Sequence, residues 1–262
     1  MSPDLRTRLE LAIAAAREAG LLTLGYFRRH DIAVEQKTDL SPVTIADRQA
    51  EQLLRKRIGE QFASDAILGE EFGETAGSTG FRWILDPIDG TKSFIRGVPL
   101  YGTLVAVEFD RRAVVGVIYI PAFDECVYAA TGQGSWYERG GMPRERARVS
   151  PRAKLAESLV STSDTRFPTV RRQEAYTRIA QAAQVSRTWG DCYGYLLVAT
   201  GRAEVMIDPI MHVWDVAPLQ PILEEAGGTL TDWEGRPTIY GSEAIATNGH
   251  VLEEVLAFTR GT

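Results

Sequence analysis

Three runs rich in β-branched and aromatic residues follow one another closely between residues 103 and 131. They read TLVAVEF, RAVVGVIYI and ECVYAAT, and short turns separate them, one of them at Asp110 and Arg111. Runs of this composition with short connections are typical of neighbouring strands in an antiparallel meander. The pattern predicts such a meander, and we expect the apolar run at residues 82–85 to belong to the same sheet.

Two amphipathic helices are predicted before this sheet. Apolar residues recur at helical spacing from Asp4 to about Arg29, and Asp4 is a candidate for the N-cap. The later segment TDLSPVTIADRQAEQLLRKRIGEQF begins with turn residues and continues with an apolar stripe. It predicts a second helix from about Pro42 to Gln61, with Asp47 in its first turns.

Strand and helix signals alternate in the rest of the chain, which is typical of an α/β arrangement. The basic, glycine-rich stretch YERGGMPRERARVSPRAKLAE interrupts the pattern and marks the best internal boundary. We therefore expect an N-terminal half at residues 1–150 and a C-terminal half at residues 151–262.

Composition argues against several classes of function. The chain has 262 residues, of which 44% are hydrophobic and 24% charged, as in ordinary globular proteins. A net charge of -6 without a basic stripe disfavours nucleic acid as a partner. The apolar runs are shorter than the roughly 18 residues of a membrane span, and Cys126 and Cys192 lack the paired spacing of a zinc site. We expect a cytoplasmic protein with no membrane partner, in which both cysteines are small buried hydrophobes.

Acidic residues gather at the ends of predicted elements. Four short apolar runs lead into acids, in TIADRQ, ILGEEFG, LDPIDGT and MHVWDVAP. A solvated acidic face would spread its charges along the outer side of a helix, so this placement indicates that the carboxylates converge. The converging residues are Asp47, Glu70, Asp86, Asp89 and Asp215, with Glu71 as a neighbour of Glu70.

Converging carboxylates need a counter-ion. Two carboxylates about 4 Å apart repel each other by about 4 kcal/mol at an effective dielectric constant of about 20. Several in one pocket therefore require protons or cations. The histidines His30, His212 and His250 show no ligand spacing, so the site would offer only oxygen ligands. Such ligands favour Mg²⁺ or Mn²⁺ over Zn²⁺, and magnesium is the predicted metal.

The segment DGTKSF adds a place for phosphate. It can begin a short helix whose first N–H groups bind phosphate oxygens, and Gly90 allows close approach of the backbone. A water molecule held between the metal and Thr91, with Glu70 to accept its proton, becomes a nucleophile at neutral pH. The implied reaction is hydrolysis of a small phosphate monoester.

The motifs GEE, DPIDGT and WDVA, in this order, resemble those of the inositol monophosphatase superfamily of Mg²⁺-dependent phosphatases. The resemblance extends from the segment 37–47 to the closing ATNG. It implies a layered αβαβα sandwich, α+β or α/β in class, and a homodimer. It also implies two or three bound Mg²⁺ ions, for which Mn²⁺ can substitute.

The resemblance further implies a role for individual residues. Metal would be bound by Glu70, Asp86, the carbonyl of Ile88, Asp89 and Asp215. Thr91 and Glu70 would orient the attacking water, and the amides of Gly90 and Thr91 would hold phosphate. Asp47 would touch a third metal that is held more weakly.

Two stretches of the C-terminal half bear on the substrate. Inositol monophosphatases typically have a glutamate that contacts inositol seven residues before the last metal aspartate, whereas this chain has Asp208 there. The segments TWGDCYGY and MIDPIM are more similar to those of the histidinol-phosphate phosphatase branch. Histidinol phosphate carries an ammonium and an imidazole, with which Asp191 and Asp208 could pair. We expect hydrolysis of this ester, a step of histidine biosynthesis, with inositol monophosphatase or a broad sugar and nucleotide phosphatase as alternatives.

Simpler readings remain open for the same residues. Asp86 and Asp89 could cap a turn, Glu70 could be a solvated loop acid, and Asp47, Asp191, Asp208 and Asp215 could have capping or turn roles. His212 is expected to be structural, and Trp83 and Trp214 to be core residues.

Other enzyme classes fit less well. In haloacid-dehalogenase-type phosphatases the two aspartates are two apart, whereas here they are three apart with Pro87 between them. The chain has no P-loop signature, which disfavours a kinase. A metal-binding module without activity would have lost ligands, and the chain keeps every expected one.

Overall fold

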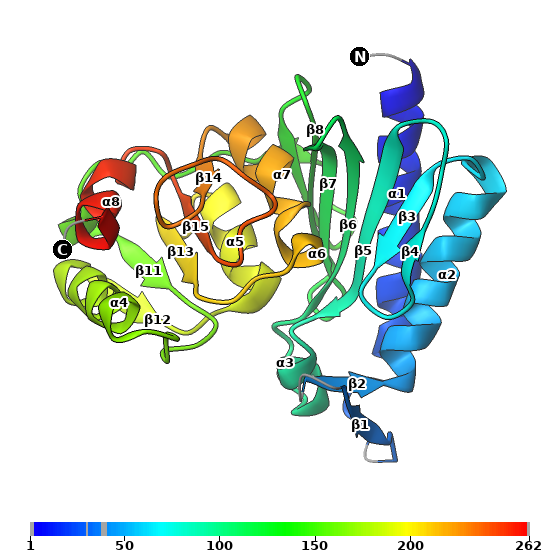
Figure 1. The fold of residues 1–262 in the computed structure, drawn as a ribbon, viewed down its shortest axis with the longest axis horizontal. Coiled ribbons are helices and arrows are strands. Elements are labelled where there is room, and N and C mark those ends of the chain that lie inside the picture. The colour runs from blue at the N-terminus through cyan, green and yellow to red at the C-terminus, as the bar shows by residue number, and fades with distance from the viewer. Residues whose placement is uncertain (1–2, 30, 38–40, 261–262) are drawn as a thin grey trace.

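A computed structural model describes residues 3–29, 31–37 and 41–260 of the chain (Figure 1). Its helices are α1 (Pro3–Leu24), α2 (Ile45–Gln61), α3 (Thr91–Ile95), α4 (Val170–Ala182), α5 (Asp191–Ala199), α6 (Val213–Val216), α7 (Leu219–Ala226) and α8 (Leu252–Arg260), with a 3₁₀ turn at Leu155–Glu157. Its strands are β1 (Val34–Gln36), β2 (Pro42–Thr44), β3 (Ala66–Gly69), β4 (Gly73–Thr75), β5 (Phe81–Asp89), β6 (Gly102–Phe109), β7 (Arg112–Ile120), β8 (Glu125–Ala130), β9 (Ser135–Arg139), β10 (Glu145–Arg146), β11 (Leu159–Ser161), β12 (Val185–Arg187), β13 (Val205–Asp208), β14 (Thr229–Thr231) and β15 (Ala244–Thr247).

The larger sheet has the strand order β10-β9-β8-β7-β6-β5-β3-β4. Strands β6, β7 and β8 form an antiparallel meander, and β5 pairs antiparallel with β6. Both predictions for this region are confirmed. Strand β3 lies parallel to β5, so the segments that follow these two strands meet at one edge of the sheet.

Helices α1 and α2 cover one face of the larger sheet (Figure 1). Four fully buried alanines of α1 allow its backbone to approach the strands closely: Ala12, Ala15, Ala16 and Ala19. The helix ends at Leu24, before the predicted Arg29, because the chain turns at Gly25. The side chain of Asp4 lies outside the described part of the structure.

The second helix also begins later than predicted. Residues Pro42–Thr44 pair with β1 as strand β2, and α2 starts at Ile45. Thr44 caps the helix, since its hydroxyl accepts a hydrogen bond from the Ala46 amide while Asp47 accepts from the Thr44 amide. This reciprocal capping box fixes the start of the helix.

A layer of helices, α5, α6 and α7, separates the larger sheet from a smaller one of order β12-β11-β13-β15-β14 (Figure 1). One apolar cluster joins the central helices to both sheets, and a second joins α4 and α8 to the outer face of the smaller sheet. The layers thus follow the order αβαβα, which confirms the predicted sandwich. The boundary near residue 150 remains a prediction.

Several smaller expectations concern single residues or helices. Cys126, Cys192 and Trp83 are buried as expected. Trp214 is partly buried: it packs against the core and also lines a cavity. Among the described helices, none is both long and apolar enough to span a bilayer.

Candidate active site

Strand β5 brings Asp86 and Asp89 to one side of the sheet edge. In a regular strand, residues three apart point to opposite faces. Here Asp86 pairs with Leu104 and Asp89 with Gly102, so the register shifts between them. Pro87 lies in this bulge, where a residue without an N–H group is tolerated, and its carbonyl accepts a hydrogen bond from Thr103. The bulge therefore turns both carboxylates toward the same cavity.

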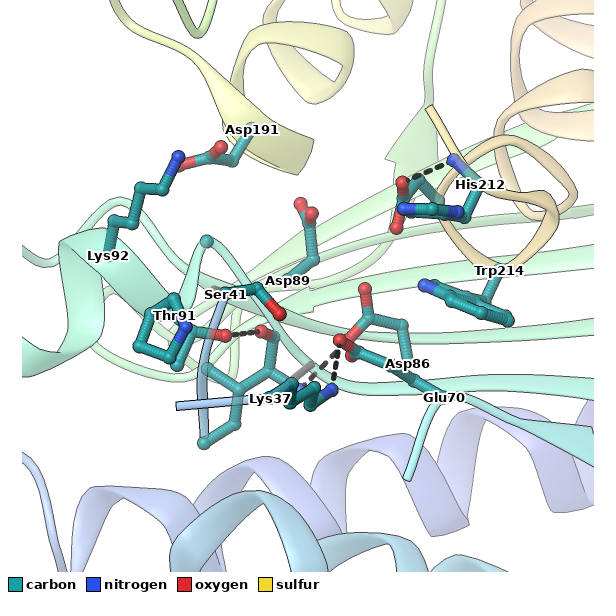
Figure 2. A pocket seen from close by; sticks show the side chains of 14 residues that line it. Lys37, Ser41, Glu70, Asp86, Asp89, Thr91, Lys92, Asp191, His212 and Trp214 are labelled. Carbon is teal, nitrogen blue, oxygen red and sulfur yellow. Dashed lines mark hydrogen bonds and ion pairs between the residues drawn. The ribbon is translucent and has the colours of Figure 1, made fainter. Parts of the chain in front are cut away.

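The two aspartates meet acids from other elements in a cavity of about 380 Å³. Carboxylate oxygens of Asp86, Asp89 and Asp215 all lie within 4.8 Å of one another. Asp215 belongs to the one-turn helix α6, where its carboxylate accepts a hydrogen bond of 2.7 Å from the His212 amide. Glu70, which follows β3, lines the same cavity, and Figure 2 shows its side chain beside that of Asp86. Three of the four acidic segments that were predicted to converge therefore line this cavity.

Burial and mutual repulsion raise the pKa values of these acids strongly. Burial raises the pKa of Asp89 to about 7, and Asp215 adds to the effect. Burial, followed by Glu70, raises the pKa of Asp215 to about 7, although the His212 amide opposes the shift. Burial and then Glu70 also raise the pKa of Asp86 well above its ordinary value. Such a cluster is stabilised by a cation, and its carboxylate donors suit a hard divalent ion.

The backbone after β5 forms a short helix that faces the cavity. Gly90 adopts φ +85, a left-handed conformation that glycine reaches without strain, and α3 begins at Thr91. The Thr91 hydroxyl donates a hydrogen bond of 3.0 Å to the carbonyl of Ile88. Gly90, Thr91 and Ile88 all line the cavity.

Asp47 lies behind this cavity and does not line it. Its side chain is fully buried at the start of α2, where it accepts hydrogen bonds from the amide and the hydroxyl of Thr44 at 2.8 and 2.6 Å. Burial raises the pKa of Asp47 to about 6. The Thr91 hydroxyl lies 3.5 Å from Asp47 Oδ1, so Asp47 is next to a residue that lines the cavity.

Two lysines supply positive charge to the cavity, and neither was singled out from the sequence. Lys37 Nζ contacts Glu70 Oε1 at 2.7 Å and Glu71 Oε1 at 2.6 Å (Figure 2 shows the Glu70 contact). Burial opposes the charge, but these two hydrogen bonds raise the pKa of Lys37 overall. Lys92, from α3, extends toward Asp191 in Figure 2. The position of Lys92 directly after DGT could have indicated this residue in the sequence.

A second cavity of about 390 Å³ adjoins the first and shares Asp89, Asp191 and Asp215 with it. Asp191, at the start of α5, lines both cavities, and burial followed by Asp89 raises its pKa to about 8. Asp208, at the end of β13, lines the second cavity but not the first. The two acids expected to contact the substrate are thus brought together next to the acidic cluster, by elements of the C-terminal half.

A family model described as the inositol monophosphatase family matches residues 4–260. The chain belongs to the inositol monophosphatase family. Among its relatives, the histidinol-phosphatase of Chlorobaculum parvum is 42% identical over 96% of this chain and 94% of that protein. The histidinol-phosphatase of Mycobacterium tuberculosis is 39% identical over 95% of this chain and 96% of that protein.

Solved structures of inositol monophosphatase family members share the fold. The IMPase of Thermotoga maritima has a TM-score of 0.85 at 30% identity, with 97% of both chains covered. The extragenic suppressor protein SuhB of Bartonella henselae has a TM-score of 0.88 at 27% identity and covers 97% of this chain and 99% of its own. Inositol monophosphatases are metal-dependent phosphatases, and the acidic cluster of this chain could hold metal.

Several residues that line the two cavities were missed or misjudged in the sequence. His212 lines both cavities, and its ring stacks on Trp214 with centroids 4.9 Å apart. Ser163 and Tyr195 line the second cavity. The serine and the tyrosine carry no local signal in the sequence, because they reach the cavity through tertiary packing alone.

Proposed function

We propose that the protein is a Mg²⁺-dependent phosphomonoesterase that hydrolyses histidinol phosphate to histidinol and phosphate. The observation that carries the proposal is the second cavity, which opens directly beside the carboxylate cluster and is lined by Asp191 and Asp208. The lining carries five aspartates against Lys92 and Arg166, and this excess of negative charge suits a leaving group with an ammonium and an imidazole. Relatives named histidinol-phosphatases, at 34–42% identity over nearly the full chain, support the same substrate.

The proposed metal ligands share one cavity. They are Glu70, Asp86, the Ile88 carbonyl, Asp89 and Asp215. A divalent cation held there would supply Lewis-acid activation of water and stabilise the charge of the leaving oxygen. We infer two Mg²⁺ ions in this cavity, replaceable by Mn²⁺, and a weaker third ion toward Asp47.

The chain itself would hold the phosphate and orient the water. The amides of Gly90 and Thr91 begin α3 at the wall of the cavity, where helix N–H groups bind anions. Thr91 Oγ1 and Glu70 would accept or donate the hydrogen bonds that fix the water, and Asp47, 3.5 Å from Thr91 Oγ1, would keep that hydroxyl in place. Lys37 and Lys92 would balance the phosphate charge.

Two further features are proposed from the resemblance and the composition. The protein would act as a homodimer, which sedimentation velocity on the purified chain would test. It would work in the cytoplasm, a location that fits two buried cysteines with no disulfide between them.

The test is phosphate release from histidinol phosphate and from inositol 1-phosphate, each with Mg²⁺ and with a chelator. We expect a large preference for histidinol phosphate that disappears with the chelator. Equal or greater activity on inositol 1-phosphate would overturn the substrate and keep the metal chemistry. Full activity in the chelator would overturn the metal chemistry.

A further inference from the structure

Ser163 connects the two carboxylates of the second cavity. Its hydroxyl donates to Asp208 Oδ2 at 3.0 Å and accepts from the backbone N–H of Asp191 at 2.7 Å. Its own amide donates to Asp208 Oδ1 at 2.8 Å. One serine therefore joins the end of β13 to the first residue of α5.

Asp208 is occupied by donors of the protein itself. Its exposed fraction is 2%, and the Tyr195 hydroxyl adds a third donor at 3.0 Å. Thr162 Oγ1 lies at 3.4 Å, although it is closer to the carbonyl of Asp164, at 2.8 Å. A carboxylate has about four acceptor sites, so well-placed protein donors fill most of them. Asp208 is thus better suited to hold Ser163 than to receive a substrate cation directly.

Asp191 adopts an uncommon backbone conformation. Its φ is +50, in the left-handed region that few residues with a Cβ occupy and that aspartate tolerates better than most. Ser163 holds its amide, and Ser93 donates to its carboxylate at 3.2 Å. The packing is tight, because a Cβ at Gly90 would lie 2.8 Å from Asp191 Oδ2 and one at Gly190 would lie 2.3 Å from the Ser163 Cα.

We infer that Ser163 is a positioning residue, which Asp208 orients and which in turn fixes Asp191 as the carboxylate that binds the cationic end of the substrate. The inference rests on the proposed function, because the cationic end belongs to histidinol phosphate. Asp191 lines both cavities, so a group bound to it lies between the phosphate site and the second cavity. Loss of the Ser163 hydroxyl frees the Asp191 amide and allows this carboxylate to turn away.

The experiment compares two esters in a double-mutant cycle. For each protein, kcat/KM is measured with histidinol phosphate and with 4-nitrophenyl phosphate, whose leaving group carries no positive charge. We expect Ser163→Ala to lower the ratio of these two values about tenfold, chiefly through KM for histidinol phosphate, the scale of one hydrogen bond in a charged site. Asp191→Asn should lower the ratio at least as far. The double variant should be no worse than Asp191→Asn, because Ser163 acts through Asp191.

Ser158→Ala is the control. Ser158 is buried, whereas Ser163 is exposed, and the variant loses one hydrogen bond, of 2.8 Å to the Lys154 carbonyl. Ser158 lines neither cavity, so the ratio should not change. Thermal unfolding of each variant shows whether it folds. Should Ser163→Ala not fold, Tyr195→Phe replaces it in the cycle, since this change removes another donor to Asp208 and keeps the ring.

The outcomes separate the two proposals. A wild-type protein without preference for histidinol phosphate would overturn the proposed function. A clear wild-type preference, together with an unchanged ratio in Ser163→Ala or in Asp191→Asn, would overturn the positioning role alone. Losses that multiply in the double variant would also overturn it, because they would mean that Ser163 contacts the substrate independently.

Discussion

At the residue scale, the bulge in β5 explains why a buried strand ends in two like charges. Asp86 and Asp89 are three apart, yet the shift in register turns both into the cavity. Neither has a partner cation of its own there: in the described structure, the contacts of Lys37 are with Glu70 and Glu71. Their charges would therefore be balanced by a bound metal ion. Removing either carboxylate should impair metal binding and turnover together.

Asp89→Asn should lower kcat at least about a hundredfold, because even residues that only support metal ligands typically contribute 10- to 100-fold. Metal affinity, measured by titration calorimetry, should fall in parallel, while circular dichroism should stay the same. Asp110→Asn is the control, since Asp110 is exposed and asparagine tolerates its φ of +51. Retained turnover in Asp89→Asn would contradict the metal assignment.

Thr91 offers a comparison at a single atom. Thr91→Val keeps the shape of the side chain but removes the hydroxyl near Ile88 O and Asp47, whereas Thr91→Ser keeps the hydroxyl. We expect kcat to fall about a hundredfold or more in the valine variant, the range of a lost proton-transfer or orienting group. The serine variant should stay within about tenfold of the wild type. Equal rates for the two variants would show that the hydroxyl has no part in orienting the water.

At the scale of elements, the central helices control the position of Asp215. Helix α6 carries this residue, and Pro218, three residues later, packs its carbonyl against β7 at Gly116. A Cβ at Gly116 would lie 2.0 Å from the Pro218 oxygen, so the helix layer would have to move away from the sheet. Packing between these elements therefore affects the position of Asp215 in the acidic cluster.

Gly116→Ala should lower the free energy of unfolding by about 3 kcal/mol through overpacking, and it should weaken metal binding because α6 shifts. Gly59→Ala is the matched variant on α2, where a Cβ meets nothing within 4 Å. It should raise the free energy of unfolding by about 0.5 to 1 kcal/mol, since alanine favours a helix more than glycine does. Urea unfolding measures the free energy of unfolding of both variants. An unchanged value for Gly116→Ala would refute the close contact.

At the scale of the whole molecule, stability should depend on pH in the opposite sense to most proteins with paired acids. The folded pKa values of Asp89, Asp215 and Asp191 are about 7, 7 and 8, well above the value near 3.9 of an unfolded aspartate. Between these limits the folded chain binds more protons than the unfolded chain. Its free energy of unfolding should therefore fall as pH rises from about 4 to about 8.

Thermal unfolding in a chelator at several pH values between 5 and 8 tests this expectation. Added Mg²⁺ should restore stability most at pH 8, by about 2.7 kcal/mol when its concentration is about 100 times its Kd. The double variant Asp89→Asn/Asp215→Asn should show a flatter pH profile and little effect of Mg²⁺. A metal-free protein that gains stability between pH 5 and 8 would contradict the argument.

The sequence by itself determined which acidic segments converge, the phosphatase family and much of the architecture. The meander over β6 to β8 and both N-terminal helices follow from periodicity and turn residues, which depend on neighbours a few positions away. The acids in GEE, DPIDGT and WDVA, at the ends of apolar runs, indicated a common cavity, and the structure gathers them there. Helix ends were less exact, because a capping box and a short strand pairing moved the start of α2.

Only the tertiary structure decided how the site residues contact one another. It placed Asp47 behind Thr91, paired Lys37 with Glu70, and joined Ser163 to Asp208, 45 positions away. It also brought the Cys192 amide, 103 positions away, into a hydrogen bond with the Asp89 carboxylate. Local patterns cannot encode such contacts, because each depends on how layers far apart in the chain pack together, and that packing is what brings charge, donor and cavity into one place.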